Sequence, residues 1–185
     1  MKKPRKSLII IILVNLFLLS GCVNLVQEVT VRPDGSGYLR FAVGGETSAY
    51  PQFQLAVPEA FQLENLFATL ILDENITDVE QTRYESGNRI WDGIEMQVAD
   101  MAALFAEERT FGPLMLSIEP NGEEFNFEQT LNLELSNLDI PGVNLLDLSG
   151  AGYSVRLITP QILSTNGLQE AAGVSLWDIP LSDLL

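Results

Sequence analysis

The stretch that decides the fold is LMLSIEPNGEEFNFEQTLNLEL, residues 114–135. Apolar and polar side chains alternate over residues 125–135, and only Gln129 interrupts the apolar series. A period of two over this length predicts an antiparallel strand with one buried and one solvated face. Residues 114–118 alternate in the same way, and the intervening Asn121-Gly122 pair favours a tight turn. The stretch therefore predicts a β-hairpin.

Other segments have the pattern of further strands. Residues 25–31 and 38–43 flank Arg32-Pro33-Asp34-Gly35, where proline and glycine favour a chain reversal, so we expect a second hairpin. Alternation also predicts strands at 76–84, 89–97, 153–158 and 174–179.

Two segments show helical spacing instead. After Pro58, which suits a first helical position, apolar residues recur at steps of three and four: Leu63, Leu66, Phe67 and Leu70. A shorter helix is expected after Asp100 as N-cap, with Met101, Leu104 and Phe105 inward. Together these elements predict an α+β domain: a curved antiparallel β-sheet built from hairpins, with one or two helices packed on one face.

The first 22 residues differ chemically from the rest. Four basic residues lie in the first six positions, an apolar run broken only by Asn15 covers residues 8–19, and Leu19-Ser20-Gly21-Cys22 follows. This order is typical of a secretory signal, because the apolar part is short for a bilayer span. Residues 19–22 resemble the bacterial lipobox, which implies that residues 1–21 are a removed signal peptide and that Cys22 carries a lipid. The alternative is an uncleaved anchor with an incidental cysteine, and both interpretations export the domain.

We expect residues 22–185 to form a single exported domain, held at the membrane by the lipid on Cys22. Its 25 acidic residues against six arginines leave a net charge of −19, without lysine or histidine. This balance argues against nucleic-acid partners, which require cations to neutralise phosphates. It also predicts repulsion from anionic headgroups, so that the domain stands off the bilayer.

The residues absent from this domain limit its chemistry. Without histidine or lysine, Ser-His and Ser-Lys mechanisms lack their base, and Cys22 is the only cysteine. We expect no catalytic residue, no cofactor and no metal site. Paired carboxylates leave a hydrolase chemically open. The densest donor cluster, residues 73–78, lacks the spacing of a calcium loop and is interpreted as a polar turn, with a Ca²⁺ site as the alternative.

Trp91 and Trp177 could stack against a ligand or belong to the core or its rim. Trp177 alternates with Val174 and Leu176 and so lies on the opposite strand face. If Val174 and Leu176 face the core, Trp177 faces solvent or a second apolar layer. This pattern favours a covered or concave second face where a lipid or partner could bind.

These motifs together resemble the LppM-like bacterial lipoproteins, a family long catalogued as a domain of unknown function. The shared features are Cys22 before a strand, the run Val31-Arg32-Pro33-Asp34-Gly35-Ser36-Gly37, and three later segments: Thr159-Pro160, Thr165-Asn166-Gly167 and Trp177-Asp178-Ile179-Pro180-Leu181. The resemblance implies an α+β envelope domain without established catalysis, with lipid or glycolipid binding proposed in the actinobacterial branch. Among the positions shared with this family, the resemblance implies a chemical role only for Cys22.

The leading hypothesis is a noncatalytic, lipid-anchored lipoprotein on the outer face of the cell membrane, or on the outer membrane where the host has one. Its domain would bind a lipid, a glycolipid or another envelope component. The alternatives are a protein-interaction or envelope-assembly module working through a sheet edge or the acidic surface, and a carboxylate-dependent glycan hydrolase.

Overall fold

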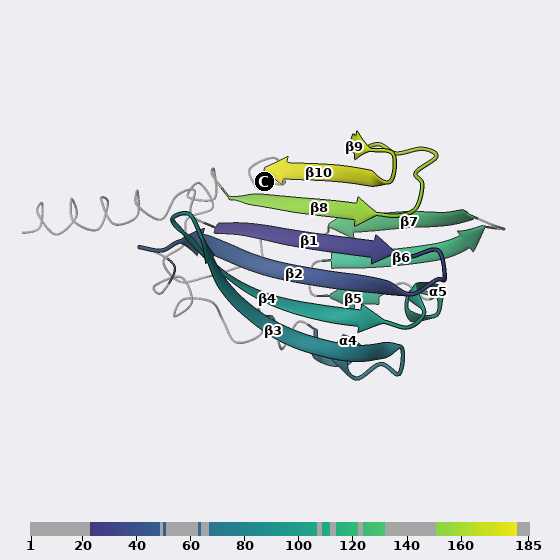
Figure 1. The fold of residues 1–185 in the computed structure, drawn as a ribbon, viewed down its shortest axis with the longest axis horizontal. Helices are drawn as coiled ribbons and strands as arrows, with labels where there is room; N and C mark the ends of the chain where they lie inside the picture. Colours follow the sequence, from purple (N-terminus) through teal and green to yellow (C-terminus); the bar gives the residue numbers. More distant parts are fainter. Residues whose placement is uncertain are drawn as a thin grey trace, which may run out of the picture.

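The computed structural model describes residues 23–48, 50, 63, 67–106, 109–111, 114–121, 124–131 and 151–180. Seven strands form one sheet in the order β3-β4-β2-β1-β8-β10-β9 (Figure 1). They are β1 (Val23–Val31), β2 (Gly37–Glu46), β3 (Ile76–Ser86), β4 (Arg89–Val98), β8 (Gly152–Ile158), β9 (Leu168–Ala171) and β10 (Val174–Pro180). A second sheet contains β5 (Arg109–Phe111), β6 (Leu114–Asn121) and β7 (Glu124–Leu131).

The predicted hairpins are confirmed. β1 pairs with β2 around a turn in which Gly35 has φ +84°, a left-handed conformation that glycine adopts without strain. The Asp34 carboxylate accepts hydrogen bonds from the backbone NH of Ser36 at 3.0 Å and from its hydroxyl at 2.7 Å. β6 pairs with β7 from Asn121 opposite Glu124 onward, as the alternating stretch predicts. Residues 132–135 of that prediction lie outside the described residues.

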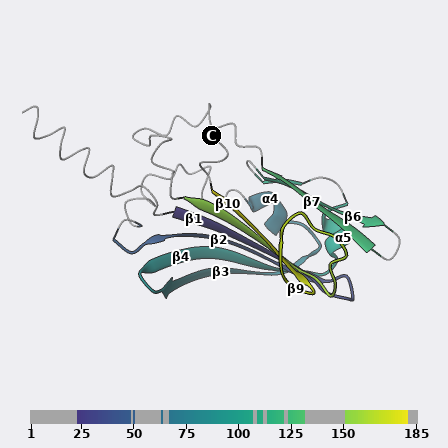
Figure 2. The same cartoon turned by 90° about the horizontal axis from the view of Figure 1, so that it is seen from above.

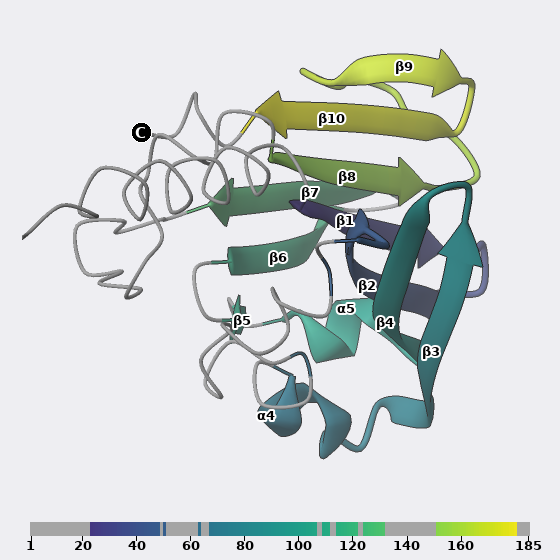
Figure 3. The same cartoon turned by 90° about the vertical axis from the view of Figure 1, so that its left-hand side faces the viewer.

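The expectation of a purely antiparallel sheet is wrong at one pair of strands. β1 and β8 run parallel, with Gln27 opposite Val155, so the large sheet is mixed. More than a hundred residues separate β1 from β8, which frees the pair from the reversal that a hairpin turn imposes. Figure 3 shows β3 and β4 inclined to β8, β9 and β10, so the sheet is curved and stays open.

The prediction of helices packed on one face of the sheet is also not supported. The helices among the described residues, α4 (Ala68–Ile71) and α5 (Met101–Leu104), are four residues each. Asp100 is the N-cap of α5 as predicted, because its carboxylate accepts from the Ala103 NH at 2.9 Å. Pro58 and Leu66, on which the longer helix was predicted, lie outside the described residues. Within the described residues, each of these two apolar patterns is followed by a single helical turn.

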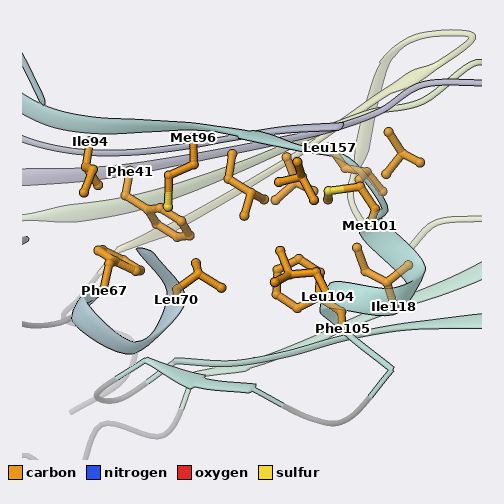
Figure 4. Close-up of a cluster of buried hydrophobic side chains, with 14 residues drawn as sticks. Phe41, Phe67, Leu70, Ile94, Met96, Met101, Leu104, Phe105, Ile118 and Leu157 are labelled. Carbon is orange, nitrogen blue, oxygen red and sulfur yellow. The ribbon is translucent and has the colours of Figure 1, made fainter. Parts of the chain in front are cut away.

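The core lies between the two sheets, on what we call the inner face of the large sheet (Figures 2 and 4). Large-sheet side chains such as Leu39, Ile94 and Met96 are at most 1% exposed. Figure 4 shows the labelled strand residues pointing toward side chains that lie below the sheet: Phe67, Leu70, Met101, Leu104, Phe105 and Ile118. The three-stranded sheet and the two single turns therefore close this face.

None of the helices in the described part of the chain has the length and apolar character of a bilayer-spanning segment.

Candidate functional site

The middle of the inner face is sealed, and it contains a buried polar cluster. Gln27 of β1 and Gln129 of β7 exchange two amide hydrogen bonds, at 2.9 and 3.0 Å. The Tyr153 hydroxyl of β8 donates to the Gln27 side-chain oxygen and accepts from the Gln129 amide. We call these three residues the amide latch. They join the two sheets through a largely apolar core, and burial raises the pKa of the Tyr153 hydroxyl.

The opposite, outer face of the large sheet carries a row of charges in one register. Glu80, Glu95, Arg40, Glu28 and Arg156 occupy consecutive paired positions from β3 across to β8. Arg40 pairs with Glu95 at 3.3 Å, and Arg156 pairs with Glu28 at 3.7 Å. Both arginines are thus neutralised within the sheet, so this face offers few free cations to a phosphate.

An aromatic pair lies on the outer face nearer the start of β1. The rings of Tyr84 and Trp91 lie within 8° of parallel, with their centroids 6.3 Å apart. Trp91 lies across Gly44, where an added Cβ would overlap the indole ring, so the strand glycine is covered by its neighbour's ring. The Arg40 guanidinium donates to the Tyr84 hydroxyl at 2.5 Å and lies 5.3 Å from its ring centroid.

A hollow opens at the same end of the large sheet, and it is our candidate functional site. Its volume is about 330 Å³. The start of β1, the start of β8 and the end of β10 contribute its lining: Asn24, Ala151, Gly152, Ser154, Asp178, Ile179 and Pro180. The Ser154 hydroxyl donates to the Asp178 carboxylate, so the polar part of the wall is already ordered. The hollow combines an amide, a hydroxyl and a carboxylate with apolar side chains, a mixture that suits an amphiphile with a hydroxyl-rich head.

Chain order places this hollow beside the predicted lipid site. Cys22 is the residue immediately before β1, and Asn24 in the hollow is the second residue of that strand. Asn24 pairs with Gly44 on one side and Gly152 on the other, and Gly44 pairs with Trp91. The aromatic pair and the hollow therefore lie in one row across the sheet. Cys22 itself lies outside the described residues, so its lipidation stays a prediction.

The prediction for Trp177 needs a correction. Val174 and Leu176 lie on the outer face with Arg156, opposite Leu176, whereas Trp177 lies on the inner face opposite Val155. Its ring stacks on Phe127 of the small sheet at 6.1 Å, so Trp177 belongs to the rim of the core, and the premise that Val174 and Leu176 face the core was wrong. The covered face is filled by side chains rather than hollow, because the small sheet packs directly on it.

The Thr165-Asn166-Gly167 motif has a structural explanation. The Trp177 indole NH donates to the Asn166 side chain at 2.9 Å, and Gly167 lies so close to the indole that a Cβ would approach it at 2.5 Å. Thr165 shares a 2.7 Å hydrogen bond with buried Ser175. These residues clamp Trp177 and, like the Asp34 turn, offer no ligand contact of their own.

The acidic clusters are less suited to binding. Asp73 closes a turn onto Asn75, whose NH and side-chain amide donate to its carboxylate at 2.9 and 3.0 Å. This confirms the polar turn predicted at the start of residues 73–78. Asp78, Glu80 and Glu95 border a hollow of about 30 Å³ beside Tyr38, with room for about one or two waters. In the part of the chain that the structure describes, no three acidic or thiol groups are placed to hold a metal ion.

The sequence did not predict Asn24, Ser154 and Asp178 as site residues. Three strands far apart in the chain bring them together, so no local pattern marks them. The amide latch left one visible signal, the polar Gln129 within an apolar series.

Comparison with known proteins gives one structural match. No protein-family model matches the chain, and no curated protein sequence matches it. The structure is similar to the NMR structure of the folded domain of LppM from Mycobacterium tuberculosis, with a TM-score of 0.49 and 16% sequence identity. The match covers 87% of this chain and 84% of the LppM domain.

Proposed function

We propose that this protein is a noncatalytic envelope lipoprotein, anchored through a lipid on Cys22, whose domain binds the sugar headgroup of a membrane amphiphile. The observation that carries the proposal is the 330 Å³ hollow, which lies two residues along β1 from the anchoring cysteine. A ligand that already resides in the bilayer would meet this end of the domain first.

The chemistry of the wall favours hydroxyl groups over phosphate. Among the described residues that line the hollow, Asp178 is the one with a charged side chain. Its negative charge repels a phosphodiester. Its carboxylate accepts hydrogen bonds, and the Asn24 amide nitrogen can donate them, while the Asn24 side-chain oxygen accepts from the Arg89 guanidinium of β4. Sugar hydroxyls can satisfy both, with Ile179 and Pro180 against the apolar part of the ligand.

A catalytic role fits these residues less well. Ser154 is hydrogen-bonded to Asp178, but the chain contains no histidine that could accept the serine proton. The pair therefore serves better as a fixed polar surface than as a nucleophile with its base.

The test uses the mature chain with serine in place of Cys22, which leaves the domain free of its lipid. Native mass spectrometry with monoglucosyl diacylglycerol should give a one-to-one adduct, and phosphatidylglycerol of the same acyl length should give much less. Asp178→Ala should weaken the glucolipid adduct about tenfold, the effect of losing one charged hydrogen bond. The matched control is Glu170→Gln, an exposed acid of β9 away from the hollow. An absent adduct, or equal binding of both lipids that Asp178→Ala leaves unchanged, would refute the proposal.

A further inference from the structure

The start of β1 leaves no room for a flexible tether. Val23 already pairs with Gly45 in the first register position of the β1–β2 ladder. If Cys22 carries the lipid, as the proposed function requires, one peptide unit of about 3.8 Å separates the lipidated residue from the sheet. The domain cannot stand off the bilayer by the length of a linker, contrary to the expectation from its charge.

The row that contains Asn24 must then lie close to the headgroups. Two residues of strand advance about 7 Å, and one headgroup layer is about 5–7 Å thick. Along this row, toward β3, lie Gly44, Trp91 and Tyr84 in successive paired positions. Figure 1 shows that the turn joining β3 to β4 lies at the same end of the sheet as the start of β1.

The aromatic pair has the chemistry of a membrane interface. Tyrosine and tryptophan have an apolar ring with one polar group, and they concentrate where hydrocarbon meets water. Tyr84 is 37% exposed on β3, an edge strand whose other outward side chains near it, Thr82 and Ser86, are polar. Arg40 donates a hydrogen bond to the Tyr84 hydroxyl, and the Trp91 ring packs on Gly44, so both rings have contacts on the sheet.

We propose that Tyr84 and Trp91 form an aromatic rim that docks on the bilayer interface and sets the domain upright on its Cys22 end. The lipid holds the domain, and the rim fixes its orientation, so that the hollow faces the headgroup layer. Glu46 and Glu85 lie near this end with Arg89, so the contact depends on ring burial rather than on attraction to anionic lipid.

The first test uses the lipidated mature protein on phosphatidylcholine vesicles. Its two tryptophans serve as probe and internal control, since Trp177 lies on the inner face, three positions further along the strands. Lipids brominated near the headgroup should quench the fluorescence of the wild type, and Trp91→Phe should remove most of the quenchable part. Vesicles with added phosphatidylglycerol should not increase the quenching.

A second measurement does not require the Trp91→Phe variant and therefore tests the proposal even if that variant does not fold. Because the Cys22 thiol is bound to lipid, single cysteines at exposed turns can be spin-labelled. Asn88→Cys lies in the β3–β4 turn, whereas Ala172→Cys lies in the β9–β10 turn, where Val174 pairs with the last residue of β8. On vesicles, a water-soluble relaxation agent should reach the label at position 88 several-fold less than the label at position 172.

The outcomes separate this proposal from the anchor on which it rests. A protein that floats with vesicles, yet shows unquenched Trp91 and equally accessible labels, overturns the docking and leaves the anchor intact. A protein that does not float overturns both. The upright docked domain is supported when Trp91 is quenched and the label at position 88 is protected while the label at position 172 is not.

Discussion

The two faces of the large sheet are built from alternate residues of the same strands, yet one face is buried and apolar and the other is open and charged. The inner face buries Leu39, Ile94 and Met96, and its buried polar side chains, Gln27 and Ser175, are hydrogen-bonded. The outer face is not covered by the small sheet, and its Arg40 and Arg156 form ion pairs with glutamates of neighbouring strands. The inner face is filled by side chains and the arginines of the outer face are paired. The end of the sheet at the start of β1 is therefore the place where we propose that a ligand binds.

The largest difference between the faces should appear in stability. Leu39→Ala removes a fully buried side chain, and we expect it to lower the free energy of unfolding by about 2–5 kcal/mol. Thr30→Ala on the outward side of β1 should change it by about 0.5 kcal/mol or less. Urea unfolding of both variants measures the contrast, and comparable losses would contradict the assignment of the two faces.

The amide latch predicts a non-additive pair. Gln129→Leu leaves the buried Gln27 amide without its partner and should cost about 1–3 kcal/mol. The double variant Gln27→Leu with Gln129→Leu should cost less than the sum of the two single variants, because neither amide is then left unpaired. Additive losses in chemical denaturation would show that the latch does not join the sheets.

The latch also predicts a dependence on alkaline pH. Burial raises the pKa of Tyr153 above its ordinary value of about 10. Its stabilising contribution is complete below that pH and is lost as the pH rises toward the higher pKa of the folded state. Between pH 8 and 11 the wild type should therefore lose about 1.4 kcal/mol more than Tyr153→Phe. Equal losses would mean that the Tyr153 hydroxyl is solvated.

The smallest effect belongs to the outer face. Glu80 lies directly opposite Glu95, a like-charge pair that weakens a sheet. Glu80→Gln should raise the free energy of unfolding by about 0.2–1 kcal/mol, and the gain should shrink in high salt. Glu85→Gln, on the same strand but opposite Ile90, is the matched control, and an equal gain there would indicate a general effect of net charge.

Local pattern was enough to locate most strands, because alternation over segments such as residues 114–118 reflects burial on one face. It could not reveal that β1 and β8 run parallel, since their pairing depends on residues far apart in the chain. The helical spacing around Phe67 is followed by a helix in the described residues only over Ala68–Ile71, and the rest of that predicted helix lies outside them. In the hollow, Asn24, Ser154 and Asp178 converge through strand register, so no local pattern could predict them, and the lipidation of Cys22 stays a prediction.

We propose that the end of the sheet beside Cys22 binds the ligand. Hydrogen exchange of the lipidated protein on vesicles, with and without monoglucosyl diacylglycerol, tests this most directly. The glucolipid should slow exchange at the backbone amides of residues 151–154 and 178–179. Slowed exchange confined to the opposite end, at residues 32–36 and 172–173, or no change anywhere, would contradict it.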